Sequence, residues 1–113
     1  ETQAMIGAAQ LAKMRKEAIL INAARGGIVD EVALAEALRS GRLGGAAVDV
    51  YAVEPPETSN PLLQLEGQAA RRLLLTPHIA GVTRQAYAIL FRSAWENVER
   101  VLLQGLAPLN RVY

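Results

Sequence analysis

The sequence predicts an α/β fold built on a parallel sheet that is incomplete within these 113 residues. Three short apolar runs have the length of buried strands, and they alternate with segments in which apolar residues recur at helical spacing. Residues 18–50 combine a strand, a helix and a second strand, which is the length of one right-handed crossover unit. Because three strands are too few to close such a sheet, we expect further strands outside this chain and interpret the chain as truncated.

The first predicted elements are a short helix and a strand. The helix covers residues 3–14, and its apolar positions are Met5, Ile6, Leu11 and Met14. The run at residues 18–22 is too short for a helix and lacks polar alternation. Such continuous apolarity is typical of a parallel strand that is covered on both faces of its sheet.

The second helix and the second strand complete the crossover unit. Asp30 is a suitable N-cap for a helix at residues 31–40, and Gly41 stands where a left-handed residue commonly ends a helix. The inward face of this helix is predicted to consist of Leu34, Ala37 and Leu38. Residues 44–50 give the second strand, whose small residues would let a helix pack closely.

Turn-forming residues dominate the next part of the chain. Residues 52–61 form a polar loop that contains Pro55, Pro56 and Pro61. Residues 62–65 suit one helical turn, and residues 73–75 give a third strand that ends at the Thr-Pro-His of residues 76–78.

A long amphipathic helix is predicted near the C-terminus. Thr83 is its N-cap, and the helix extends to about Gln104, where Gly105 ends it. Its apolar residues recur at helical spacing and are Tyr87, Leu90, Phe91, Ala94, Val98, Val101 and Leu102. Residues 106–113 have no predicted element and are expected to dock on another part of the protein. Without a partner the helix would expose an apolar face, so we expect the isolated chain to be poorly stable.

Composition excludes several classes of function. The net charge of +1, with scattered basic residues, does not suit nucleic-acid binding. No apolar run reaches the roughly 18 to 20 residues that a membrane span needs. Cysteine is absent, which excludes thiolate metal sites and fits a reducing compartment, so we expect a cytoplasmic protein. The sequence also lacks the dinucleotide-binding glycine motif, the Walker A motif and zinc-binding signatures, and no metal is expected.

Ionisable residues follow each of the three predicted strands. Arg25 follows the first strand, Asp49 stands at the end of the second with Glu54 after it, and His78 follows the third. Ligands of open α/β sheets bind beyond the carboxyl ends of the strands. An arginine can hold a carboxylate with two parallel hydrogen bonds, and a histidine can exchange a proton with a hydroxyl group. This combination favours a site for a hydroxy acid or keto acid.

Each of these residues alone also has an ordinary structural interpretation. Arg25 could bond to loop carbonyl groups, Asp49 could anchor a loop, and Glu54 could be a solvated charge beside two prolines. A single histidine such as His78 is more often structural or solvent-exposed than catalytic. Only their joint placement at the strand ends favours a functional site, and the residues alone indicate no more than an acid-handling cleft.

Four motifs in chain order resemble the D-isomer-specific 2-hydroxyacid dehydrogenases. They are the strand, arginine and glycines of residues 19–30, the helix and strand of residues 34–51, the Glu54-Pro55 pair, and the histidine block of residues 75–83. The resemblance extends over nearly the whole chain. Residues 67–72 look like an insertion relative to the family pattern.

The resemblance implies a Rossmann-type, doubly wound parallel sheet of which this chain is the truncated C-terminal part. Residues 1–82 would be the C-terminal half of an NAD(P)-binding domain, and residues 83–113 would be a helix and tail that return to the substrate domain. The glycine-rich phosphate loop would lie upstream, so this chain alone is expected to be inactive. The complete protein would use NAD or NADP and would be a homodimer.

The resemblance also implies a role for each site residue. Arg25 would hold the carboxylate and the carbonyl oxygen of the substrate, and His78 would be the general acid in reduction and the base in oxidation. Glu54 would pair with His78 and favour its protonated form, and Asp49 would bond to the nicotinamide carboxamide. The full set expected around the cofactor is Ala23, Ala24, Arg25, Asp49, His78, Ala80 and Gly81.

The predicted activity is therefore hydride transfer between NAD(P)H and a small D-2-hydroxy acid or 2-keto acid. Phosphoglycerate, glycerate or hydroxypyruvate, glyoxylate and lactate are all possible substrates. Formate dehydrogenases resemble this group but carry glutamine where Glu54 stands, so they are disfavoured. The alternatives are a non-catalytic NAD-binding protein similar to the related corepressors, and a truncated remnant without activity.

Overall fold

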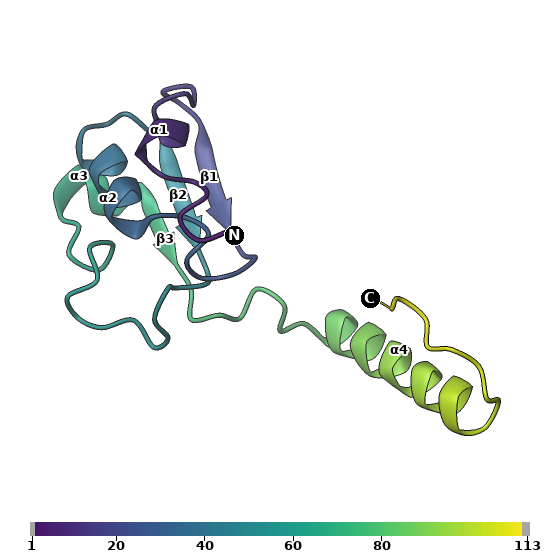
Figure 1. The fold of residues 1–113 in the computed structure, drawn as a ribbon. Coiled ribbons are helices and arrows are strands. Elements are labelled where there is room, and N and C mark those ends of the chain that lie inside the picture. The colour runs from purple at the N-terminus through teal and green to yellow at the C-terminus, as the bar shows by residue number, and fades with distance from the viewer. Residues whose placement is uncertain (1, 112–113) are drawn as a thin grey trace. The chain divides into compact units, whose positions relative to one another are not determined.

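The computed structural model describes residues 2–111 and divides the chain into two compact units, Glu1–Ala80 and Gly81–Tyr113 (Figure 1). The first unit contains a three-stranded parallel sheet in the order β1-β2-β3, which confirms the predicted α/β class. The elements are α1 (Ala8–Leu11), β1 (Ile19–Asn22), α2 (Glu31–Arg39), β2 (Gly45–Val48), α3 (Gly67–Arg71), β3 (Leu73–Leu75) and α4 (Arg84–Leu102).

Helix α2 begins and ends as its flanking residues predict. The Asp30 Oδ1 atom accepts hydrogen bonds from the backbone nitrogens of Val32 and Ala33 at 2.9 and 3.0 Å. These bonds satisfy two of the amide groups that the first turn of a helix leaves free. Gly41 adopts a φ of +67°, the left-handed conformation that follows many helix ends.

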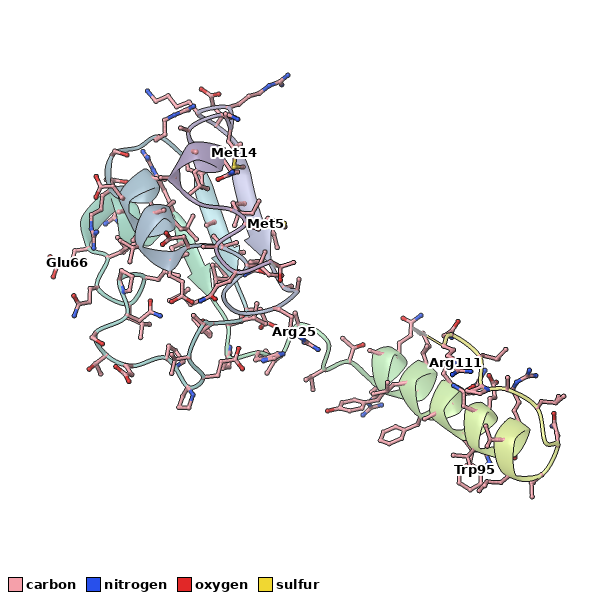
Figure 2. The ribbon with its side chains drawn as sticks, viewed as in Figure 1. Met5, Met14, Arg25, Glu66, Trp95 and Arg111 are labelled. Carbon is pink, nitrogen blue, oxygen red and sulfur yellow. The ribbon has the colours of Figure 1, made fainter. Side chains whose placement is uncertain are left out.

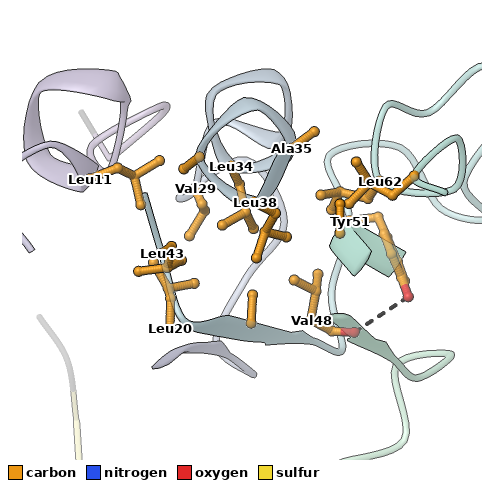
Figure 3. Close-up of a cluster of buried hydrophobic side chains, with 14 residues drawn as sticks. Leu11, Leu20, Val29, Leu34, Ala35, Leu38, Leu43, Val48, Tyr51 and Leu62 are labelled. Atoms are coloured by element: carbon orange, nitrogen blue, oxygen red, sulfur yellow. Dashed lines mark hydrogen bonds between the residues drawn. The ribbon is translucent and has the colours of Figure 1, made fainter. Parts of the chain in front are cut away.

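The core lies between the sheet and the helices that cross one of its faces (Figure 3). Leu34 and Leu38 of α2 have exposed fractions of 0 and 1% and occupy its centre. The largest fully buried side chains are Leu11, Leu34, Leu38, Leu43, Leu62 and Val50. The sequence had predicted that both faces of the sheet are covered, and this prediction was wrong for the described residues. Ile19 and Ile21 of β1 are 68 and 73% exposed because no described segment packs over their face.

Two glycines explain the close approach of chain segments at the start of β2. A Cβ atom on Gly44 would lie 2.6 Å from the carbonyl oxygen of Glu17, and one on Gly45 would lie 3.0 Å from that of Arg72. The small residues at these positions therefore accommodate neighbouring backbone. Ala46, the next small residue of β2, lies in the core with residues of α2.

Several local predictions need correction. The helix expected at residues 3–14 is only the four-residue α1, because Ile6 instead forms an isolated parallel bridge with Val29. The insertion expected at residues 67–72 stays a prediction; in the structure these residues contain helix α3, which buries Ala69 in the core. Residues 62–65 form hydrogen-bonded turns rather than a helical turn.

The second unit consists of α4 and a tail that folds back along it. The Thr83 Oγ1 atom accepts a hydrogen bond from the Ala86 nitrogen at 3.0 Å, which confirms the predicted N-cap. The Leu109 nitrogen donates to the Asn97 side chain at 2.6 Å, so the tail docks on its own helix. Val112 and Tyr113, the last residues of the predicted tail, lie outside the described residues.

Helix α4 ends two residues before the predicted position, at Leu102, and none of its side chains is buried. Trp95 projects from it with an exposed fraction of 64% (Figure 2). Among the described residues no helix is both long and apolar enough to cross a membrane.

Candidate active site

Hydrogen bonds between backbone groups join the three segments that follow the strands. The Asp49 nitrogen, one residue after β2, donates to the Asn22 carbonyl oxygen at 2.9 Å. The His78 nitrogen, three residues after β3, donates to the Asp49 carbonyl oxygen at 2.8 Å. The segments that carry the predicted site residues therefore lie side by side at the carboxyl edge of the sheet.

Glu54 and His78 form the central contact of the site. The Glu54 Oε2 atom lies 2.8 Å from the His78 Nδ1 atom, and the Glu54 Oε1 atom accepts a hydrogen bond from the Tyr51 nitrogen at 2.9 Å. An ionised carboxylate only accepts hydrogen bonds, so the His78 Nδ1 atom must be the donor. The Nε2 atom is then the ring position that can gain or lose a proton.

Hydrogen bonding keeps Glu54 in the ionised form that this arrangement requires. The bond from His78, and next the bond from the Tyr51 nitrogen, lower the pKa of the Glu54 carboxyl below its ordinary value. Glu54 is therefore a carboxylate throughout the neutral pH range, and it orients the imidazole ring of His78.

His78 also has an unusual backbone conformation. Its φ of +54° lies in the left-handed region, which only a few per cent of residues other than glycine adopt, with asparagine, aspartate and histidine the most frequent among them. Such a conformation costs of order 1–3 kcal/mol and persists only where surrounding contacts fix it. Residues of this kind cluster at active sites, which supports a functional role for His78.

Asp49 fixes the segment on both sides of His78. Its Oδ1 atom accepts from the Thr76 hydroxyl at 2.6 Å and from the Ile79 nitrogen at 2.8 Å, and its Oδ2 atom accepts from the Ala80 nitrogen at 2.9 Å. The residue is only 5% exposed. The bond from Thr76, followed by those from the Ala80 and Ile79 nitrogens, lowers the pKa of the Asp49 carboxyl despite the opposing effect of burial.

These three bonds restrict the role that Asp49 can have toward a ligand. A carboxylate has about four acceptor positions, so about one remains free. The predicted bond to a nicotinamide carboxamide therefore stays a prediction that needs this last position.

Tyr51 connects the Glu54 loop to the end of β3. Its buried phenol donates to the Thr76 carbonyl oxygen at 2.9 Å, and its backbone nitrogen is the donor to Glu54. Burial, with the nearby negative charge of Asp49, raises the pKa of the Tyr51 phenol. The phenol therefore stays protonated and keeps its donor bond.

Arg25 lies on the loop after β1 and is exposed (Figure 2). The Asn22 side chain supports this loop by accepting from the Ala24 nitrogen and donating to the Arg25 carbonyl oxygen, each at 3.3 Å. Within residues 2–111 the Arg25 guanidinium bonds only to the Ala24 carbonyl oxygen, at 3.3 Å. The structure thus joins Glu54 to His78 and leaves the Arg25 guanidinium exposed.

A hollow of about 340 Å³ lies beside Glu54 and His78. Its walls are Tyr51, Glu54, Pro55, Pro56, Pro77 and His78. A larger hollow of about 500 Å³ lies between α1 and α2, but it contains none of the residues from the strand ends. Because the hydrogen-bonded pair of Glu54 and His78 lines the smaller hollow, we place the candidate site there.

Known proteins share this arrangement of sequence and fold. The family described as D-isomer specific 2-hydroxyacid dehydrogenase, NAD binding domain, matches residues 1–80. The chain belongs to this family. Its first 80 residues are therefore part of an NAD-binding domain, and the parallel sheet with flanking helices is part of the Rossmann-type fold that the resemblance implied.

Three of the most similar proteins extend this result. A glycerate dehydrogenase from Methylorubrum extorquens is 48% identical over 99 residues, which cover 88% of this chain and 31% of the relative. A D-isomer specific 2-hydroxyacid dehydrogenase from Xanthobacter autotrophicus Py2, solved with NADPH and MES, has a TM-score of 0.78 and 37% identity over 99% of this chain and 43% of that one. A D-lactate dehydrogenase from Lactobacillus jensenii, solved with NAD+, has a TM-score of 0.76 and 29% identity over 99% and 36% of the two chains.

Sequence reasoning missed the residues whose hydrogen bonds support the candidate site. Tyr51, Thr76 and Asn60 received no role, and Glu31 was assigned only as the start of a helix. Their hydrogen bonds join segments that are far apart in the sequence, for example the Tyr51 phenol and the Thr76 carbonyl. The only sequence signal for these supporting roles was that polar residues stand next to the predicted site residues.

The low pKa of the Asp49 carboxyl predicts a specific dependence of stability on pH. A carboxyl group whose pKa is lower in the folded state stabilises that state above its ordinary pKa, and this contribution is lost as the pH falls through the lowered value. In the complete protein that carries this chain, Asp49→Asn should therefore reduce the free energy of unfolding at pH 7. The difference from the parent protein should shrink below about pH 4.

Denaturant unfolding measured across this pH range tests the prediction. Glu66→Gln is the matched control, because Glu66 is exposed and its side chain makes no cap bond. If the free energy of unfolding of Asp49→Asn is lower than that of the parent protein by the same amount from neutral pH to about pH 3, the assigned electrostatic role is contradicted.

Proposed function

We propose that the complete protein transfers a hydride between NAD(P)H and the C2 carbon of a small 2-keto acid, giving a D-2-hydroxy acid, and that it also catalyses the reverse reaction. The observation that carries this proposal is the 2.8 Å contact of Glu54 with His78 at the carboxyl edge of a parallel sheet in this family. The chain spans about a third of the length of the glycerate dehydrogenase relative, so the activity belongs to the whole protein.

His78 is the proposed proton donor in keto-acid reduction. With its Nδ1 proton directed at Glu54, its Nε2 atom gives a proton to the carbonyl oxygen as the hydride adds to C2. In the reverse direction the same atom takes the hydroxyl proton. Glu54 stabilises the positive charge that the ring carries before it donates.

Arg25 is the proposed anchor of the substrate. Its exposed guanidinium can form two parallel hydrogen bonds to a carboxylate, and it can also polarise the adjacent carbonyl oxygen. This requires a 2-keto acid, in which the carboxylate and the reacting carbonyl are neighbours. Glycerate and lactate, which the two named relatives act on as their names state, have the matching hydroxy-acid structure.

The residues at the strand edge fit a nicotinamide cofactor. Ala23, Ala24 and Ala80 are exposed and small, and Gly81 has no side chain. Asp49 retains about one acceptor position that suits the amide group of a carboxamide. When bound, the cofactor would supply or accept the hydride. One solved relative holds NADPH and another holds NAD+, so both cofactors belong in the test.

We further propose how the chain is divided between domains. Residues 1–82 would complete an NAD(P)-binding domain, and residues 83–113 would return to a substrate domain. The exposed apolar face of α4 supports this division, because such a face requires a partner in the folded protein. Residues 1–113 would then be inactive alone, and the complete protein would be a homodimer.

The test measures oxidation of NADH and NADPH by the complete protein with glyoxylate, hydroxypyruvate, pyruvate and 2-ketoglutarate. We expect turnover with at least one of these acids and none with the matching acids that lack the keto group. Binding of reduced cofactor, measured separately by fluorescence, distinguishes two kinds of failure. Cofactor binding without turnover would favour the alternative, a non-catalytic NAD-binding protein, whereas no binding would favour an inactive remnant.

A further inference from the structure

The loop that carries Glu54 is held by a residue from another element. Glu31 is the first residue of α2, and both of its carboxylate oxygens accept hydrogen bonds from this loop. The Oε1 atom accepts from the Ala52 nitrogen and the Oε2 atom accepts from the Asn60 side chain, each at 2.8 Å. One carboxylate thus fixes both ends of residues 52–60, a segment without helix or strand.

The Ala52 end of this contact is close to the proposed chemistry. Ala52 directly follows Tyr51, whose nitrogen donates to Glu54 at 2.9 Å. Glu54 itself is exposed, and its side chain bonds only to Tyr51 and His78 among the described residues. The Glu31 bonds are therefore among the contacts that fix the backbone on either side of Glu54.

The same contact also joins the Glu54 loop to the Arg25 loop. Gly26 lies so close to Tyr51 that a Cβ atom there would be 1.7 Å from the Tyr51 carbonyl oxygen. The chain segment from Arg25 to Glu31 thus touches residues 51 and 52 at two points. A shift of one loop would be transmitted to the other.

We propose that Glu31 is a positioning residue, whose carboxylate clasps the Glu54 loop to the N-terminus of α2 and so sets the Glu54–His78 contact. Its role in turnover rests on the proposed dehydrogenase function. Its effect on the Glu54 carboxyl does not rest on that function, because the clasp is a feature of the fold.

The test compares two isosteric substitutions on one helix in the complete protein. Glu31→Gln keeps the shape but turns one acceptor into a donor, which faces a donor of the loop. Glu36→Gln is the matched control, because Glu36 is exposed on α2 and has only a 3.9 Å contact with Arg39. We expect Glu31→Gln to lower kcat about tenfold with little change in KM, as small misplacements of reacting groups do. The control should match the parent protein.

A second readout does not depend on turnover. The pKa of the Glu54 carboxyl, followed by carbon-13 NMR, should rise toward its ordinary value in Glu31→Gln because the bond from His78 weakens. Asn60→Ala, which removes only one of the two donors, should shift it in the same direction by less. Thermal unfolding shows whether the Glu31→Gln variant is folded. If it is folded and its Glu54 pKa is unchanged, Glu31 does not set the Glu54–His78 contact. If the parent protein shows no turnover, the dehydrogenase proposal fails. The NMR titration of Glu54 still tests the positioning role of Glu31 in that case.

Discussion

Replacing His78 by asparagine in the complete protein is expected to lower kcat by about 10²- to 10⁴-fold, the usual contribution of a general acid or base. The Nε2 atom of His78 is the only proton donor that the Glu54 contact orients in the described site. Asparagine is a suitable replacement because it tolerates the left-handed conformation, here a φ of +54°. The backbone bond from residue 78 to the Asp49 carbonyl should therefore survive.

The binding of reduced cofactor separates chemistry from structure in this variant. We expect its dissociation constant to change much less than kcat, because the lost proton transfer acts on the substrate. Glu54→Gln should give a smaller loss of kcat, since it leaves the imidazole in place but removes the charge beside it. A His78→Asn protein that retains parental turnover would show that the proton comes from another group.

Gly26→Ala is expected to destabilise the protein by about 3 kcal/mol or more, at the upper end of the cost of overpacking. The new methyl group would lie 1.7 Å from the Tyr51 carbonyl oxygen, and that oxygen belongs to backbone that cannot rotate away. This clash can be relieved only if the Arg25 loop moves away from the segment that leads to Glu54. Turnover should therefore fall together with stability.

The neighbouring glycine provides the control for this substitution. Gly27 has a φ of +79°, and a Cβ atom added there would meet nothing within 4 Å, so Gly27→Ala adds backbone strain without a clash. Its expected cost is about 1–2 kcal/mol, the penalty for a left-handed alanine. Equal losses for the two variants in denaturant unfolding would refute the close approach of Gly26 to Tyr51.

The elements that the sequence predicted well depend on local signals. Asp30 caps α2 through its own neighbours, and the apolar run at residues 18–22 has the length and continuous apolarity of a buried strand. The helix predicted at residues 3–14 was wrong because Ile6 pairs with Val29, a contact between distant segments that no local pattern reveals. The covering of only one face of the sheet likewise depends on which other segments are present.

The same distinction applies to the site. Glu54 lies in the loop after the second strand, and His78 lies just after the third. These positions predicted that the two residues share one edge of the sheet, and in the structure they are in contact. The path of residues 52–60 could not be predicted, so the bonds of Glu31 to Ala52 and Asn60 were not expected. A carboxylate at the start of a helix has an ordinary role in stabilising that helix, which gave no reason to connect Glu31 with the site.

Transfer of deuterium from labelled cofactor to product is the most direct test of the proposed hydride transfer. The complete protein would be given reduced nicotinamide cofactor that carries deuterium at the transferred C4 position, together with the keto acid that it turns over best. We expect one deuterium at C2 of the D-2-hydroxy acid, with the hydroxyl proton taken from solvent through His78. A product that carries no deuterium at C2 would contradict direct hydride transfer in this protein.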